Sequence, residues 1–201
     1  MREDLTEVAV VLDRSGSMEA IRSDAIGGFN AFLASQKKDE GELRLTLVLF
    51  NHEVETVHAR VPIAEVPPLD ETTYVPAGMT ALLDAVGRTV DELGERLAAT
   101  PEAERPAQVI VAILTDGLEN SSRDYTPARI RQRIRRQRER YGWEFLFLAA
   151  GQDAVVEGGK LDIPAADAIA FEATPEGILE ASACLSEETT ARKRRKKKLV
   201  N

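Results

Sequence analysis

Residues 8–17 read Val-Ala-Val-Val-Leu-Asp-Arg-Ser-Gly-Ser, and this stretch decides which fold the sequence predicts. Five apolar residues, three of them valine, are typical of a strand that is buried on both faces. The polar residues that follow at once, Asp13, Ser15 and Ser17, then lie on the turn that leaves the strand. Their side chains offer oxygen ligands, which a hard cation such as Mg²⁺ prefers. The sequence therefore predicts a buried strand with an oxygen-rich turn at its carboxyl end.

The composition indicates a single domain with an uneven distribution of charge. The chain has 201 residues and a net charge of −8. Residues 192–198 hold seven of the 26 lysines and arginines, so the rest of the chain has a net charge of −15. Cys184 is the only cysteine, and no apolar segment near the N-terminus resembles a signal peptide or a membrane span. We therefore expect a cytoplasmic protein with one domain over residues 1–190. We expect residues 191–201 to form a basic tail that is disordered or frayed.

Apolar runs of strand length alternate with longer segments of helical period along the chain. This pattern is typical of an α/β protein with a doubly wound, Rossmann-like, mostly parallel sheet and helices on both faces. One run differs, because residues 54–61 follow the previous run after only three residues, too few for a parallel crossover. We expect it to form one antiparallel edge strand. The other expected strands are residues 8–12, 43–50, 109–114, 143–149 and 168–171, and the expected helices are residues 18–37, 80–98, 126–141 and a last helix from 174.

Two further polar residues are expected at the same edge of the sheet. Asp116 follows the strand over 109–114, and Thr80 opens the helix over 80–98 after a surface loop over 62–78. Parallel sheets bind ligands at the carboxyl ends of their strands, near the point where the strand order reverses. Two carboxylates and three hydroxyls are too few for Ca²⁺ but form a partial shell for Mg²⁺, with Mn²⁺ as the alternative. The predicted metal ligands are Asp13, Ser15, Ser17, Thr80 and Asp116.

These residues resemble the metal-ion-dependent adhesion site of the von Willebrand factor A domains. That site reads Asp-x-Ser-x-Ser, then a distant Thr, then a distant Asp. The chain has the three elements in this order, as Asp13-Arg14-Ser15-Gly16-Ser17, Gly78-Met79-Thr80 and Leu114-Thr115-Asp116-Gly117. The resemblance extends over about residues 5–171. One departure is Met79, because many members of the family have a second glycine at this position, and its side chain restricts how far Thr80 can swing.

The resemblance implies a function as well as a fold. It implies that Ser15 and Ser17 bind the metal directly, that Thr80 does so in the ligand-bound state, and that Asp13 and Asp116 act largely through water. An Asp or Glu of a protein partner would complete the metal shell, and helix N-termini after Ser17 and Thr80 would favour that anion. Residues 141–153 resemble small intracellular bacterial A-type domains, which implies an assembly, stress-response or regulatory complex.

Four residues beside the motif are candidates for a partner-binding rim. They are Arg14, Met79, Gly117 and Asn120. A structural alternative stays open for them, since Arg14 also suits a solvated position and Asn120 a polar loop.

Two other functions are weighed against a binding module. A Mg²⁺-dependent phosphohydrolase also uses acidic sites at strand ends. However, phosphatases of the haloacid dehalogenase type have a second aspartate where this chain has Ser15. The chain also has no Walker A loop, which argues against nucleotide hydrolysis. We therefore expect no enzyme. Nucleic acid is a less favoured partner, through the arginine-rich helix over 126–141 or the basic tail. We expect no membrane partner.

Overall fold

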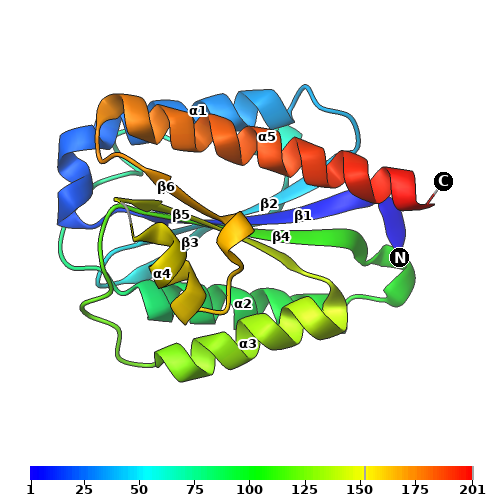
Figure 1. Ribbon diagram of the computed structural model, residues 1–201. Coiled ribbons are helices and arrows are strands. Elements are labelled where there is room, and N and C mark those ends of the chain that lie inside the picture. The colour runs from blue at the N-terminus through cyan, green and yellow to red at the C-terminus, as the bar shows by residue number, and fades with distance from the viewer. Residues whose placement is uncertain (152, 201) are drawn as a thin grey trace.

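The computed structural model describes residues 1–151 and 153–200, with side chains up to Arg195. The described residues contain one six-stranded sheet with the strand order β3-β2-β1-β4-β5-β6 (Figure 1). All neighbouring strands are parallel except β2 and β3, which are antiparallel. The predicted α/β fold with one antiparallel edge strand is confirmed. The strands are β1 Arg2–Asp13, β2 Glu42–Phe50, β3 Val54–Pro62, β4 Pro106–Thr115, β5 Glu144–Ala150 and β6 Ala168–Phe171.

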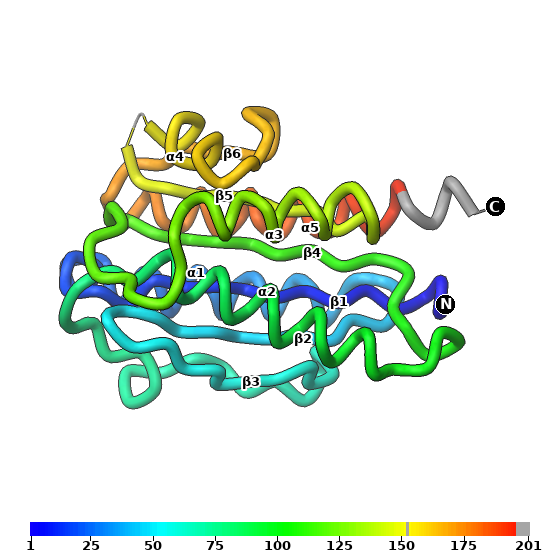
Figure 2. The backbone as a smooth tube through the Cα atoms, turned by 90° about the horizontal axis from the view of Figure 1, so that it is seen from below, coloured from blue at the N-terminus to red at the C-terminus, as the bar shows by residue number. Residues whose placement is uncertain are grey.

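Helices cover both faces of the sheet (Figures 1 and 2). α1 Arg22–Gln36 and α5 Pro175–Val200 lie on one face, and α2 Leu82–Ala99, α3 Pro127–Tyr141 and α4 Ala154–Lys160 lie on the other. The sequence did not predict α4, which has only seven residues. The 3₁₀ helices are η1 Gly16–Ile21, η2 Ile63–Glu65, η3 Glu102–Glu104 and η4 Ala165–Asp167.

The central strand β1 explains why its sequence is a continuous apolar run. Val8, Val10 and Leu12 pack in the core beneath α1 and α5, whereas Ala9 and Val11 pack in the core beneath α2 and α3. Side chains alternate between the two faces of a strand, so a strand with helices on both sides needs apolar residues at every position. β4 and β5 follow the same rule.

The segment between β3 and α2 lies at the surface as expected, but three of its side chains anchor it in the core. Val66, Leu69 and Tyr74 are buried in the core beneath α1 and α5. The Asn30 side chain of α1 donates a hydrogen bond to the Leu69 carbonyl and accepts one from the Leu69 amide. The segment therefore packs as part of the domain, because its few apolar residues lie in the core beside α1. These residues have no regular spacing in the sequence.

Acidic residues hold the C-terminal part of α5 against the domain. Arg192 is buried and forms ion pairs of 2.6 Å with Glu144 and with Asp167, while Lys193 pairs with Asp39 at 2.9 Å. These paired acids offset the repulsion among the basic residues 192–195, and the disorder of the tail stays a prediction. The side chains of 196–200, and residue 201, lie outside the described residues.

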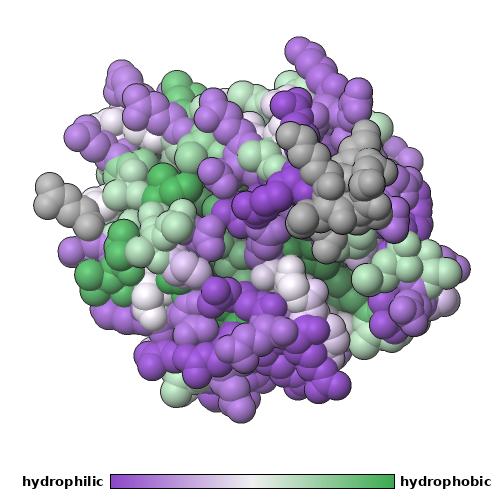
Figure 3. Space-filling view, turned by 45° about the vertical axis from the view of Figure 1, so that its right-hand side comes forward, coloured by the Kyte–Doolittle hydropathy of each residue, from purple (hydrophilic) through white to green (hydrophobic). Residues whose placement is uncertain are grey.

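Most arginines of α3 have partners inside the protein. Arg133 binds Asp91, and Arg135 and Arg138 both bind Asp162. The helix gives the lower part of the molecule in Figure 3 its hydrophilic surface. This pairing favours the solvated-face interpretation of α3 over a nucleic-acid site. Within the described residues, no helix is both long and apolar enough to cross a membrane.

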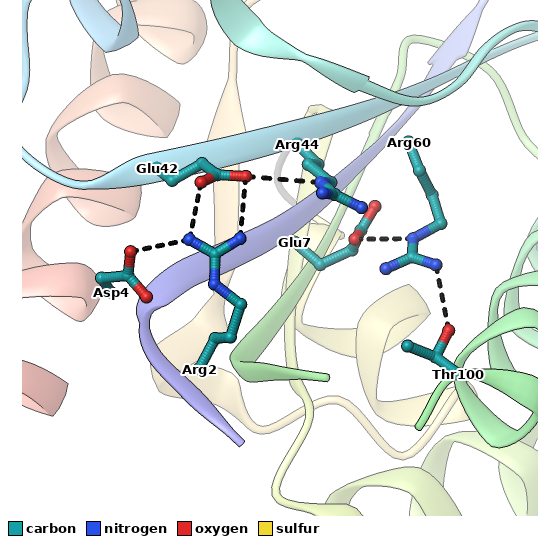
Figure 4. Close-up of polar contacts among 7 residues, drawn as sticks. All are labelled: Arg2, Asp4, Glu7, Glu42, Arg44, Arg60 and Thr100. Atoms are coloured by element: carbon teal, nitrogen blue, oxygen red, sulfur yellow. Dashed lines mark hydrogen bonds and ion pairs between the residues drawn. The ribbon is translucent and has the colours of Figure 1, made fainter. Parts of the chain in front are cut away.

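A buried carboxylate ties the edge strand β3 to the central strand (Figure 4). Glu7 of β1 is fully buried, and its Oε2 atom accepts a hydrogen bond of 2.9 Å from Arg60 Nε of β3. Arg60 has a positive φ of 56°, and its Nη1 atom reaches Thr100. Burial raises the pKa of Glu7 to about 7, although the charges of Arg60 and Arg44 oppose the shift. The folded protein therefore binds a proton at Glu7 more tightly than the unfolded chain does.

We expect Glu7 to make stability depend on pH. Its contribution is fully present below the ordinary pKa of 4.5 and is lost as the pH rises to about 7, because the unfolded chain ionises first. The free energy of unfolding should fall by ~1–3 kcal/mol across this range, and Glu7→Gln should remove most of that fall. Urea unfolding at several pH values measures both. Glu3→Gln, at an exposed position of the same strand, is the control, and equal pH slopes for wild type and Glu7→Gln would contradict the assignment.

Candidate metal centre

The candidate site lies where the sheet reverses its strand order. β1 pairs with β4 in parallel, with Leu12 opposite Leu114, so Asp13 and Asp116 leave neighbouring strands at the same edge. The loop that precedes α2 reaches this edge as well: Gly16 donates a backbone hydrogen bond of 3.0 Å to Gly78, and Ala77 donates one of 2.9 Å to Arg14. Three segments far apart in the sequence therefore meet here.

All five predicted residues are close together. Ser17 Oγ donates a hydrogen bond of 2.6 Å to Asp116 Oδ1 and lies 3.1 Å from Ser15 Oγ. Asp13 Oδ1 accepts a hydrogen bond of 2.6 Å from the Ser15 amide. A methyl group at Gly117 would lie 3.0 Å from the hydroxyl oxygen of Thr80 and 3.8 Å from Asp13 Oδ2, so these two oxygens border one space.

The site is closed on one side and open on the other. Asp13, Ser15 and Thr80 are buried, Asp116 is half-buried and Ser17 is exposed. Burial raises the pKa of Asp13 to about 6 despite hydrogen bonds from Thr115 and Ser15, and it raises the pKa of Asp116 as well. Burial disfavours the ionised form of both carboxyls, and a cation beside them would offset that cost.

The donor set suits a hard cation that keeps water or takes a ligand from outside. It consists of two carboxylates and three hydroxyls, and such oxygens favour Mg²⁺ or Mn²⁺ over softer ions. The described residues hold no cluster of three or more His, Cys, Asp or Glu side chains that suits a metal. Hydroxyl groups therefore have to supply much of the coordination at this site.

Sequence reasoning missed the residues that hold Asp13 in place. Thr115 Oγ1 donates a hydrogen bond of 2.6 Å to Asp13 Oδ2 and accepts one of 3.1 Å from the Gly117 amide. The buried Tyr74 hydroxyl donates to the Asp13 carbonyl. Thr115 precedes Asp116 directly, so its position in the motif could have suggested a role at the site. Nothing in the sequence connects Tyr74 with residue 13.

A second missed residue, Asp84 of α2, fixes the loop after Asp116. Its carboxylate accepts backbone hydrogen bonds from Arg123, Asp124 and Tyr125, at 2.8 to 3.0 Å. The loop is thereby tied to the first turn of α2, four residues after Thr80. Thr80 itself is linked to the loop through Asn120.

The four rim candidates have different surroundings. Met79 is 53% exposed at the site, and Gly117 is half-buried beside Thr80. Arg14 is not a freely solvated side chain, because it pairs with Glu55 at 2.7 Å and is largely buried. Asn120 accepts a hydrogen bond of 2.8 Å from the Thr80 amide, so it joins two loops of the site.

The helix starts near the site differ from the prediction. Ser17 lies within the 3₁₀ helix η1, and α1 begins only at Arg22. The expectation that an α-helix begins directly after Ser17 is therefore wrong, because the turn there is 3₁₀ and α1 starts four residues after Met18. α2 begins at Leu82, close to Thr80 as expected, and the Leu83 amide at this end is taken by Glu119.

Comparison with known proteins shows the fold. No family model and no curated protein sequence matches the chain. Among solved structures, proximal thread matrix protein 1 from the mussel byssus, with a zinc-occupied MIDAS motif, is similar with a TM-score of 0.64 and 16% identity over 92% of this chain. The von Willebrand factor type A protein from Catenulispora acidiphila is similar with a TM-score of 0.56 and 17% identity over 94% of this chain. The chain has the von Willebrand factor A fold.

A third structure agrees with this fold. The ArnB paralog VWA2 from Sulfolobus acidocaldarius has a TM-score of 0.59 and 15% identity over 90% of this chain. The A-type fold described here spans 46%, 42% and 44% of the mussel, Catenulispora and Sulfolobus chains, which is less than half of each.

We expect Thr115→Val to destabilise the A-type domain. The change keeps the shape of the side chain but leaves Asp13 Oδ2 and the Gly117 amide without their partner. Loss of a hydrogen bond that leaves buried polar groups unpaired costs ~1–3 kcal/mol of unfolding free energy. Thermal unfolding measures the loss. Thr115→Ser keeps the hydroxyl and should stay close to wild type; if both variants lose the same stability, the hydroxyl has no special role.

Proposed function

We propose that this chain is a metal-dependent protein-binding module. In this proposal Ser15, Ser17 and Thr80 hold Mg²⁺, with Mn²⁺ as the alternative, while Asp13 and Asp116 act largely through water. The observation that carries it is the Ser15–Ser17–Asp116 chain of short contacts beside buried Asp13 and Thr80 at one sheet edge. The zinc-occupied MIDAS motif of the mussel protein supports a divalent ion in an A-type fold.

The binding step follows from charge and exposure. The bound ion would supply electrostatic attraction for an Asp or Glu carboxylate of a protein partner. Only two carboxylates lie at the site, so their negative charge would not exceed the charge of a divalent ion, and the ion could still attract a further carboxylate. Ser17 and Asp116 form the accessible side, and the exposed Met79 stands beside it. An incoming carboxylate would approach from this side, because Asp13, Ser15 and Thr80 close the other.

The geometry of Asp13 argues against the phosphohydrolase alternative. An aspartate that attacks phosphorus has to present a free oxygen to the substrate. Both oxygens of Asp13 accept hydrogen bonds of 2.6 Å, from Ser15 and from Thr115, and the residue has no exposed surface. We therefore propose a binding role without catalysis.

The setting of this module remains a sequence prediction. An intracellular assembly, stress-response or regulatory complex is implied by the resemblance of residues 141–153 to small bacterial A-type domains. The cytoplasmic location is proposed from the cysteine content, a single Cys184. We keep both as parts of the proposal.

Metal binding should raise the thermal stability of the protein. Mg²⁺ at about 100 times its dissociation constant should add ~2.7 kcal/mol relative to EDTA. Ser17→Ala should reduce this gain, because it removes one oxygen ligand at an exposed position where loss of the hydroxyl leaves the core intact. Ser35→Ala, an exposed hydroxyl on α1, is the matched control. The metal proposal is wrong if Mg²⁺ and Mn²⁺ give no gain in wild type, and the site is elsewhere if Ser17→Ala keeps the full gain.

We expect no phosphatase activity. With Mg²⁺ or Mn²⁺ present, hydrolysis of p-nitrophenyl phosphate and of a panel of phosphate monoesters should stay at the rate of buffer alone. Absorbance at the nitrophenolate band and a phosphate assay measure this. Turnover that disappears in Asp13→Asn, in a sample whose unfolding curve stays cooperative, would replace the binding role with the enzymatic one.

A further inference from the structure

A cavity of about 190 Å³ lies directly beside the candidate metal centre. It opens at the carboxyl ends of β4 and β5, next to the first turns of α4, and Asp116 borders it. For comparison, an engineered protein cavity of ~150 Å³ holds a benzene molecule. The space is therefore large enough for one long side chain of another molecule.

The floor of the cavity is apolar. Leu82, Phe147, Ala149 and Ala154 line it and are buried. An aliphatic stem that covers these atoms would remove apolar surface from water, which is favourable. Small ligand sites are commonly lined in this way, with a few polar groups that fix the orientation of the ligand.

The mouth of the cavity is acidic. Asp116, Glu119, Asp153 and Glu157 line it, and none of the lining residues is a lysine or an arginine. Glu119 is fully occupied, because its oxygens accept hydrogen bonds from the Leu83, Ser121 and Ser122 amides and from the Ser122 hydroxyl. The carboxylate at the mouth that remains for a ligand is chiefly that of the exposed Asp153, whose side chain has no hydrogen bond or ion pair among the described residues.

A second acid stands next to Asp153. Glu157, one turn along α4, is partly exposed and pairs with Lys160 at 2.6 Å. This pair lies at the surface, where exchange of one cation for another costs little. A positively charged group at the mouth would therefore meet Asp153 directly and Glu157 after a small rearrangement.

We propose that this cavity is a subsite for a lysine or arginine side chain of the partner. The aliphatic stem would lie on the apolar floor, and the cationic head would meet Asp153 at the mouth. The inference rests on the proposed function for its setting. Asp116 belongs to both places, so the basic residue would stand close in sequence to the carboxylate that meets the metal. The partner class is thereby narrowed to segments in which an acidic and a basic residue are near neighbours.

The subsite is tested in EDTA, where the metal centre plays no part. ¹⁵N-labelled protein is titrated with n-butylammonium and n-propylguanidinium chloride, which reproduce the lysine and arginine side chains, and with n-butanol, which has a similar stem and no charge. Both cations should shift the amide signals of Gly117, Leu118 and Ala154 in a saturable way. Their affinity should exceed that of n-butanol about two- to fivefold, as expected for one solvent-exposed ion pair.

Two variants test whether the Asp153 carboxylate causes the higher affinity of the cations. Asp153→Asn should bring the cation affinities down to that of n-butanol, while Glu95→Gln, an exposed acid on α2 outside the cavity, should leave them unchanged. Three results would each overturn the subsite: n-butanol binding as well as the cations, Asp153→Asn binding as well as wild type, or equal losses in both variants. The first result would point to an apolar side chain as the occupant. The thermal titration with Mg²⁺ reports separately on the metal centre, so failure of one is distinguishable from failure of the other.

Discussion

The pairing of β1 with β4 is the constraint on which the candidate site depends. It places Asp13 beside Thr115, and the hydrogen bond of 2.6 Å between them joins two segments that are 102 residues apart. A carboxylate without exposed surface needs such donors, because a buried charge that has none is costly. The same bond holds Asp13 Oδ2 beside the space that the Thr80 hydroxyl also borders. The fold and the polar chemistry of the site are thus parts of one arrangement.

Polar groups of the loops hold one another in fixed positions around this site. The Gly16–Gly78 backbone bond joins the first loop to the second, and the bond from the Thr80 amide to Asn120 joins the second to the third. Gly78 has a φ of 74°, in the left-handed region that favours glycine, and a methyl group there would overlap the ring of His52. A site whose ligands come from loops stays organised when the loops are connected in this way.

Charge is divided between different parts of the molecule. Arg133, Arg135 and Arg138 of α3 and Arg192 of α5 pair with acids of the domain, at Asp91, Asp162 and Glu144. The carboxyl edge of the sheet keeps carboxylates and hydroxyls and has no basic lining residue in its cavity. In our proposal this edge binds a partner's carboxylate, and that binding requires a cation to reverse the local charge. The proposed metal centre and the basic-side-chain subsite therefore belong to the same surface.

The sequence by itself determined the strand runs, the antiparallel edge strand and the three separate parts of the site, because these depend on local periodicity, on short connections and on residue types at fixed spacing. It did not determine the Thr115 and Tyr74 bonds to Asp13, the burial of Val66, Leu69 and Tyr74, or the ion pairs of Arg192 and Lys193. Each of these depends on contacts between residues far apart in the chain, such as Arg192 with Glu144. The helix start after Ser17 was wrong for a related reason. The first turn there is a 3₁₀ helix, η1, and it buries Met18 and Ile21 in the core, so tertiary packing outweighs the local signal for an α-helix.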